Sequence, residues 1–81
     1  MNEMRRHVLV VDDEPAIRRF LRTSLTAHGY EVLEAASGQA ALSSVAAHPP
    51  DLIILDLGLP DIDGIEVTQR LRGWTQIPIV I

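Results

Sequence analysis

The chain has 81 residues and no cysteine, which limits it to one small domain and excludes a disulfide framework or a thiolate metal site. Apolar residues make up 47% of the sequence and charged residues 22%, so the chain is globular rather than disordered. The net charge of −4 argues against a nucleic-acid surface on this segment, and no apolar run is long enough for a membrane span.

The apolar pattern predicts four strands and three helices in alternation. After a polar lead at residues 1–6, which we expect to be frayed, the predicted strands are His7–Val11, Tyr30–Ala35, Leu52–Asp56 and Ile77–Ile81. The predicted helices run from Pro15 to His28, from Ser37 to about Ala47, and from Ile65 to near Gly73. This alternation is typical of a three-layer α/β fold, in which helices cover both faces of a mostly parallel sheet.

The first predicted helix has an apolar stripe. Ile17, Phe20, Leu21 and Leu25 recur at helical spacing, and the arginines of this segment lie mostly off the stripe. We therefore expect these four apolar side chains to pack against the sheet.

The run Leu52–Asp56 is the most informative stretch of the chain. Its four consecutive aliphatic residues, bounded by turn residues, predict a strand that is buried on both faces. Its last residue, Asp56, is then carried to the carboxyl edge of the sheet, where open α/β sheets bind ligands. Asp12 and Asp13 follow the first predicted strand in the same way. The three carboxylates therefore converge if the first and third strands are neighbours.

Carboxylates this close repel one another, so such a cluster favours a bound cation. Hard oxygen ligands suit Mg²⁺, and Mg²⁺ beside a carboxylate is a recurrent arrangement for phosphoryl transfer. Because aspartyl phosphate is a known covalent intermediate, we interpret Asp56 as the reactive group and Asp12 and Asp13 as its metal-binding partners.

Each of these acidic residues also has a purely structural explanation. A strand that ends in Asp often forms only an Asx turn, and Asp12-Asp13-Glu14 alone is more often a favourable charge cluster at the start of a helix. Asp61 and Asp63 lie in a segment like part of a calcium loop, but its later bidentate ligand is missing, so we interpret them as turn formers. The combination of two acidic strand ends at β-α-β spacing is what favours a functional site.

The segments Val8–Glu14 and Leu52–Gly64 together resemble the receiver domain of bacterial two-component response regulators. The resemblance covers the chain from His7 to Ile81, and Ile17–Leu25 resembles in particular regulators of potassium uptake in the winged-helix DNA-binding subfamily. It implies a flavodoxin-like fold with a parallel sheet in the order 2-1-3-4, truncated before a fifth strand.

The resemblance also implies roles for individual residues. Asp56 would accept a phosphoryl group from a sensor histidine kinase, and Asp13, assisted by Asp12, would hold Mg²⁺ together with Asp56 and the backbone carbonyl of Gly58. The residues that would shape the loop beside the site are Pro60 and Gly64. The protein would be a cytoplasmic signalling module with no membrane partner and at most slow self-dephosphorylation. It would control transcription through a downstream DNA-binding domain that is absent from this chain.

The sequence departs from the family pattern at its end. Family members continue to a Ser or Thr that contacts the phosphoryl group and to a fifth strand ending in a lysine, whereas this chain stops at Ile81 and has only arginines as its seven basic residues. We therefore expect a fragment in which labelling of Asp56 is weak or absent. We also expect marginal stability and self-association through the exposed edge of the fourth strand.

Two other functions stay open on the sequence alone. One is a receiver that acts only as a protein-interaction module, without phosphorylation. The other is a Mg²⁺-dependent phosphatase with an aspartyl nucleophile, which is less favoured because Asp56-Leu57-Gly58 lacks the second acid of that class.

Overall fold

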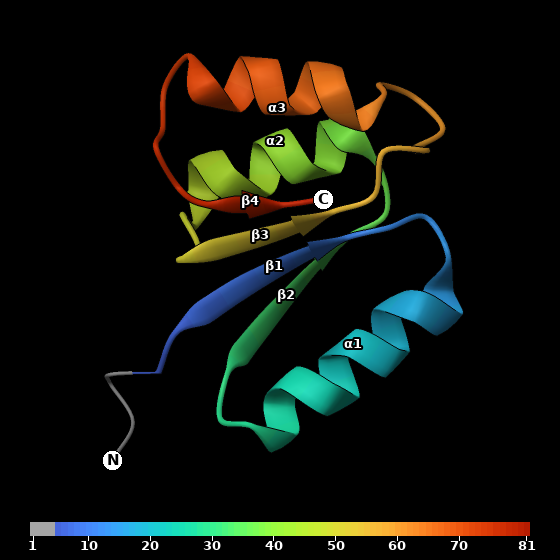
Figure 1. Cartoon of the computed structure of the whole chain (residues 1–81), viewed down its shortest axis with the longest axis vertical. Coiled ribbons are helices and arrows are strands. Elements are labelled where there is room, and N and C mark those ends of the chain that lie inside the picture. Colours follow the sequence, from blue (N-terminus) through green and yellow to red (C-terminus); the bar gives the residue numbers. More distant parts are fainter. Residues whose placement is uncertain (1–4) are drawn as a thin grey trace.

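The computed structural model describes residues 5–81 as a four-stranded sheet between two layers of helices (Figure 1). The strands are β1 (His7–Val11), β2 (Glu31–Ala35), β3 (Leu52–Leu55) and β4 (Ile79–Val80). The helices are α1 (Pro15–Ala27), α2 (Gly38–Ala47) and α3 (Gly64–Arg72). The strand order is β2-β1-β3-β4 with parallel pairing throughout, which confirms the predicted flavodoxin-like arrangement.

The polar lead that was expected to be frayed falls partly outside the described residues, at positions 1–4. Its last two residues lie against β2. The Arg6 carbonyl accepts a hydrogen bond from the Glu31 N–H at 2.9 Å, and Arg5 Nη1 donates to Glu31 Oε2 at 3.2 Å.

The central strand β1 contributes to a separate core on each face of the sheet, because successive side chains of a strand point in opposite directions. Leu9 and Val11 lie in the larger core and are at most 1% exposed. Helices α2 and α3 cover this face of the sheet (Figure 1). Val8 and Val10 lie in a smaller core with α1. Four consecutive apolar residues are therefore buried in β1, as expected of a strand covered on both faces.

The side of α1 that faces the sheet differs from the predicted one. Leu21 and Leu25 do pack on the smaller core, but Phe20 is 70% exposed and Ile17 is 44% exposed. The prediction that Ile17 and Phe20 pack against the sheet is therefore wrong. Arg18 is partly buried one turn before Leu21, and its side chain is only 19% exposed. A guanidinium can occupy this inward position because a carboxylate of β2 pairs with it.

Three strands are shorter than predicted, and β2 begins one residue later, at Glu31. β3 ends at Leu55, so Asp56 lies just beyond it, although the Asp56 N–H still bonds the Val11 carbonyl at 2.9 Å. β4 contains only two residues instead of the predicted Ile77–Ile81. Pairing begins late because the Ile77 N–H bonds the Thr75 hydroxyl oxygen at 3.3 Å and Pro78 has no N–H to donate.

The helices begin and end at residues with identifiable capping roles. Gly29 stops α1 in the left-handed conformation, at φ 92°, and its N–H bonds the Thr26 carbonyl at 3.0 Å. Ser37 caps α2 by accepting a hydrogen bond from Ala40 N–H at 3.1 Å. Among the described helices, none has the length and apolar character required to cross a bilayer.

Candidate metal centre

Three aspartates lie together at the carboxyl edge of the sheet. Asp12, Asp13 and Asp56 each offer one carboxylate oxygen, and these oxygens all lie within 4.8 Å of one another. They meet because β1 and β3 are parallel neighbours in which Val11 is paired with Leu55, so the residues that follow both strands reach the same edge. The structure thus brings together the three side chains that the sequence placed at two strand ends.

Backbone hydrogen bonds fix the two aspartates that directly follow the strands. Asp12 is 9% exposed, and its N–H donates to the Ala35 carbonyl at 3.1 Å. Its Oδ1 accepts a hydrogen bond from Glu14 N–H at 2.9 Å, which is the Asx turn that the sequence allowed. Asp56 is half-buried, whereas Asp13 is exposed. The Asp12 carboxylate therefore has a structural hydrogen-bond partner, the Glu14 N–H, in addition to the two other carboxylates of the cluster.

The donor set fits a hard divalent cation. It contains only carboxylate oxygens, which are the ligands that Mg²⁺ takes in proteins. Two oxygens bound directly to one Mg²⁺ at about 2.0–2.1 Å lie at most about 4.2 Å apart. Oxygens that lie within 4.8 Å of one another therefore suit an ion that some carboxylates contact directly and others reach through water.

The loop after β3 owes its path to a glycine that tolerates close backbone contact. A Cβ on Gly64 would lie 2.7 Å from Leu57 Cα and 2.9 Å from the Asp56 carbonyl oxygen. Gly58 differs, because a Cβ there would meet only Asp56 Oδ2, at 3.8 Å. Pro60 is exposed in the same loop. Gly64 therefore allows the start of α3 to pack directly on the backbone beside Asp56.

Asp61 connects this loop to α2, a role that the sequence did not reveal. Its carboxylate oxygens accept hydrogen bonds from Gly38 N–H at 2.8 Å and from Gln39 N–H at 2.9 Å. These bonds, first from Gln39 and then from Gly38, lower the pKa of Asp61 to about 2. Asp63 has the local role expected of a turn former. Its Oδ1 accepts a hydrogen bond from Glu66 N–H at 2.9 Å and so caps the start of α3. Of these two aspartates, Asp61 is therefore the one that links segments distant in the sequence, namely the loop after β3 and helix α2.

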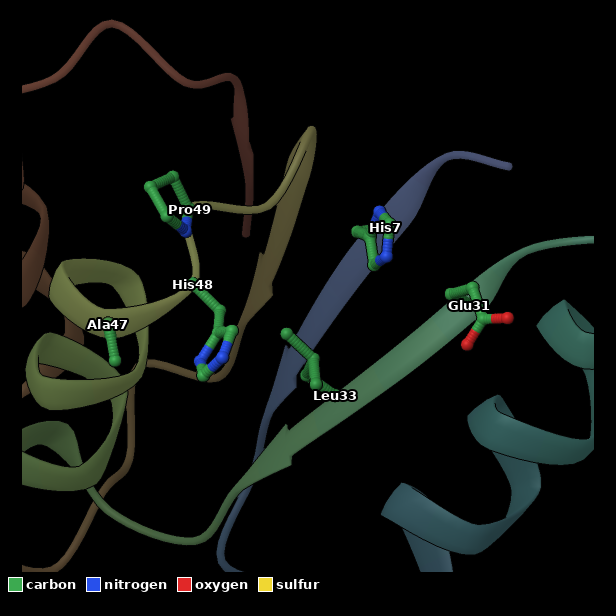
Figure 2. A pocket seen from close by; sticks show the side chains of 6 residues that line it. All are labelled: His7, Glu31, Leu33, Ala47, His48 and Pro49. Atoms are coloured by element: carbon green, nitrogen blue, oxygen red, sulfur yellow. The ribbon is translucent and has the colours of Figure 1, made fainter. Parts of the chain in front are cut away.

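A separate hollow of about 410 Å³ lies at the opposite edge of the sheet, where the strands begin (Figure 2). It is lined by His7, Glu31, Leu33, Ala47, His48 and Pro49. Within residues 5–81, the aspartate cluster is the one group of three His, Cys, Asp or Glu side chains close enough to share a metal ion. The candidate centre is therefore the acidic edge and not this hollow.

The structure therefore combines a parallel α/β sheet with an acidic cluster at the carboxyl ends of its first and third strands. The chain belongs to the response regulator receiver domain family, whose model matches residues 8–81. The resemblance to receiver domains seen in the sequence motifs is therefore confirmed.

Curated relatives include transcriptional regulators. The chain is 55% identical over 74 residues to the transcriptional regulatory protein KdpE of Mycobacterium tuberculosis, covering 91% of this chain and 33% of that protein. It is also 55% identical over 75 residues to the KDP operon transcriptional regulatory protein KdpE of Escherichia coli, covering 93% of this chain and 33% of that protein. The chain therefore spans about a third of the length of these relatives.

Solved structures show the same fold. The chain superposes on the response regulator TrrA of Thermotoga maritima, in complex with Mg²⁺ and BeF, with a TM-score of 0.86 and 40% identity over 91% of this chain and 65% of that chain. TrrA in complex with the histidine kinase ThkA gives the same TM-score, identity and coverage.

Replacing Gly64 with alanine should destabilise the domain, because the new Cβ would lie 2.7 Å from a backbone atom of Leu57. Overpacking of this kind typically costs about 1–3 kcal/mol, which urea unfolding followed by circular dichroism would measure. Gly58→Ala is the matched control, because its Cβ would meet its nearest atom at 3.8 Å. Equal losses of stability in the two variants would contradict this explanation of the loop.

Asp61 should make the stability of the domain depend on pH. Its pKa is about 2 in the folded chain against an ordinary 3.8, so its contribution is present above about pH 4 and is lost as the pH falls towards 2. We expect the urea midpoint to fall less steeply over this range in Asp61→Asn than in the wild type. The two proteins share every other carboxylate, so parallel pH profiles would show that Asp61 does not stabilise the loop in this way.

Proposed function

We propose that this chain is the phosphoacceptor module of a response regulator. In this proposal Asp56 receives the phosphoryl group, and Asp12, Asp13, Asp56 and the Gly58 backbone carbonyl hold Mg²⁺ beside it. The convergence of three carboxylate oxygens within 4.8 Å at the carboxyl edge of the sheet is the observation that carries the proposal. The Mg²⁺–BeF complex of the relative TrrA supports it, because that protein shares the fold at 40% identity.

The proposed reaction is a displacement at phosphorus. A carboxylate oxygen of Asp56 attacks the phosphorus of a donor, a new O–P bond forms, and the donor's leaving group departs with the electrons of the bond that breaks. When bound, Mg²⁺ would supply positive charge for the phosphoryl oxygens. The hydrogen bond from Asp56 N–H to the Val11 carbonyl, at 2.9 Å, fixes the backbone that carries the nucleophile. Asp12 and Asp13 would hold the ion and take no part in bond formation.

The module would accept a phosphoryl group and would not turn over a substrate of its own. Water would later hydrolyse the aspartyl phosphate, which amounts at most to slow self-dephosphorylation. This distinguishes it from a phosphatase that uses an aspartyl nucleophile.

We propose that the module is cytoplasmic and that its donor is a sensor histidine kinase. The complex of TrrA with ThkA supports a partner of this class. DNA binding and control of transcription would belong to a further domain, as the names of the relatives suggest. We also propose self-association through the edge of β4, where Val80 is 52% exposed. Sedimentation velocity should then show a concentration-dependent dimer, and a monomer at every concentration would contradict self-association.

Incubation with acetyl phosphate and Mg²⁺ should add one phosphoryl group at Asp56, with acetate as the leaving group. We expect a minor labelled fraction, because the chain has no lysine to pair with the transferred oxygens. Intact-protein and peptide mass spectrometry would measure the fraction and its position, and EDTA should abolish it.

The matched variants for this experiment are Asp56→Asn and Asp51→Asn. Asp51 lies just before β3, at the opposite end of that strand from Asp56, so its variant should label like the wild type. Wild-type labelling in Asp56→Asn would contradict the phosphoacceptor role. Complete absence of label from the wild type, together with no response to Mg²⁺, would instead favour an interaction module that works without phosphorylation.

A further inference from the structure

We propose that Arg18 is a positioning residue for the metal centre, which it acts on through the backbone carbonyl of Asp12. The inference rests on the proposed function, in that Asp12, Asp13 and Asp56 hold a divalent cation. It concerns a residue of α1 that is not itself a ligand.

The guanidinium of Arg18 joins the acidic edge to β2. Its Nη1 donates to the Asp12 carbonyl oxygen at 2.7 Å, and its Nε donates to Glu34 Oε1 at 3.0 Å. The side chain is only 19% exposed, so water screens these bonds less than it would on an open surface. A planar guanidinium presents donors in a fixed fork, so one side chain sets the direction of both bonds.

Glu34 is held in place for this contact by a second arginine. Its Oε2 accepts a hydrogen bond from Arg22 Nε, while Arg22 Nη2 also donates to the Val32 carbonyl at 3.2 Å. Hydrogen bonds from Arg22 and then Arg18 lower the pKa of the Glu34 carboxyl, so Glu34 remains a charged partner at neutral pH. Arg18 and Arg22 therefore share one carboxylate, and each bonds one backbone carbonyl.

The difference between the two arginines lies in which carbonyl they contact. Arg22 bonds a carbonyl within β2, whereas Arg18 bonds the carbonyl of the peptide unit that joins Asp12 to Asp13. On the other side of Asp12, its N–H is already bonded to Ala35. With both sides of Asp12 bonded, the plane of the following peptide is fixed, and this plane sets the positions of the Asp13 N and Cα from which its side chain projects.

Asp13 depends on this arrangement because it is exposed. Packing against neighbours does not restrict the Asp13 side chain as it would in the core. The direction of this side chain therefore depends on the orientation of its backbone. Groups that orient metal ligands from outside typically change metal affinity by about 10–100-fold when they are removed. Arg18 acts on the backbone and not on a carboxylate, so we expect an effect near the lower end of that range.

The test compares Arg18→Gln with Arg22→Gln. Both variants lose an ion pair with Glu34 and one bond to a backbone carbonyl, so they are matched for a merely structural role. Mn²⁺ serves as the probe because it suits the same oxygen ligands and its free form is measured directly by electron paramagnetic resonance. We expect the dissociation constant for Mn²⁺ to rise about tenfold in Arg18→Gln and less than about twofold in Arg22→Gln.

A second readout needs no metal. Hydrogen exchange at the hydrogen-bonded amides of Asp12 and Glu14 in the metal-free protein should accelerate in Arg18→Gln but not in Arg22→Gln. If Arg18→Gln does not fold, the same comparison is made with Arg18→Lys and Arg22→Lys. Lysine keeps the charge but cannot reproduce the rigid two-way contact of the guanidinium, so the expected order of affinities is the same.

The outcomes separate this inference from the function on which it rests. Equal Mn²⁺ affinity in the two arginine variants would overturn the positioning role of Arg18 while the metal centre stands. Failure of the wild-type chain to bind Mn²⁺, or unchanged binding in Asp13→Asn, would overturn the metal centre and the positioning role together.

Discussion

Repulsion among three carboxylates is the constraint on which the rest of the structure depends. Asp12, Asp13 and Asp56 place oxygens within 4.8 Å of one another, and nothing in the cluster itself attracts them. The parallel pairing of β1 with β3 holds them there, because it carries the ends of both strands to one edge. The strands can do so because their apolar side chains are buried in cores on both faces of the sheet. Hydrophobic burial thus offsets an electrostatic cost at the site.

The loops that carry the carboxylates are fixed from outside the cluster. Asp61 joins the loop after β3 to the first turn of α2, and Gly64 lets α3 begin against the backbone beside Asp56. On the other loop, Arg18 contacts the carbonyl of Asp12. Each of these contacts acts on the backbone or on a neighbouring element, and none of them uses a carboxylate of the cluster. Within residues 5–81, the acidic cluster is thus held in place without an ion pair to any of its three carboxylates.

Local pattern was enough to predict much of this architecture. Continuous aliphatic runs identify buried strands, and an acidic residue directly after such a run places Asp56 at the carboxyl edge. The strand order came from the family resemblance, since alternation alone does not fix it. Contacts across the fold were not predictable. Phe20 lies outside the core because Arg18 takes the inward position with Glu34, and Asp61 caps a helix that begins 23 residues earlier in the chain.

The proposed function depends above all on the binding of one divalent cation at the acidic edge. Titration of the ¹⁵N-labelled chain with Mg²⁺, followed by nuclear magnetic resonance, tests it most directly. We expect saturable shifts at the amides of Asp13, Asp56 and Gly58, and loss of these shifts in Asp13→Asn. The hollow at the opposite edge, beside His48, should remain unchanged (Figure 2). An absence of saturable shifts at the acidic edge, or equal shifts in Asp13→Asn, would contradict the account.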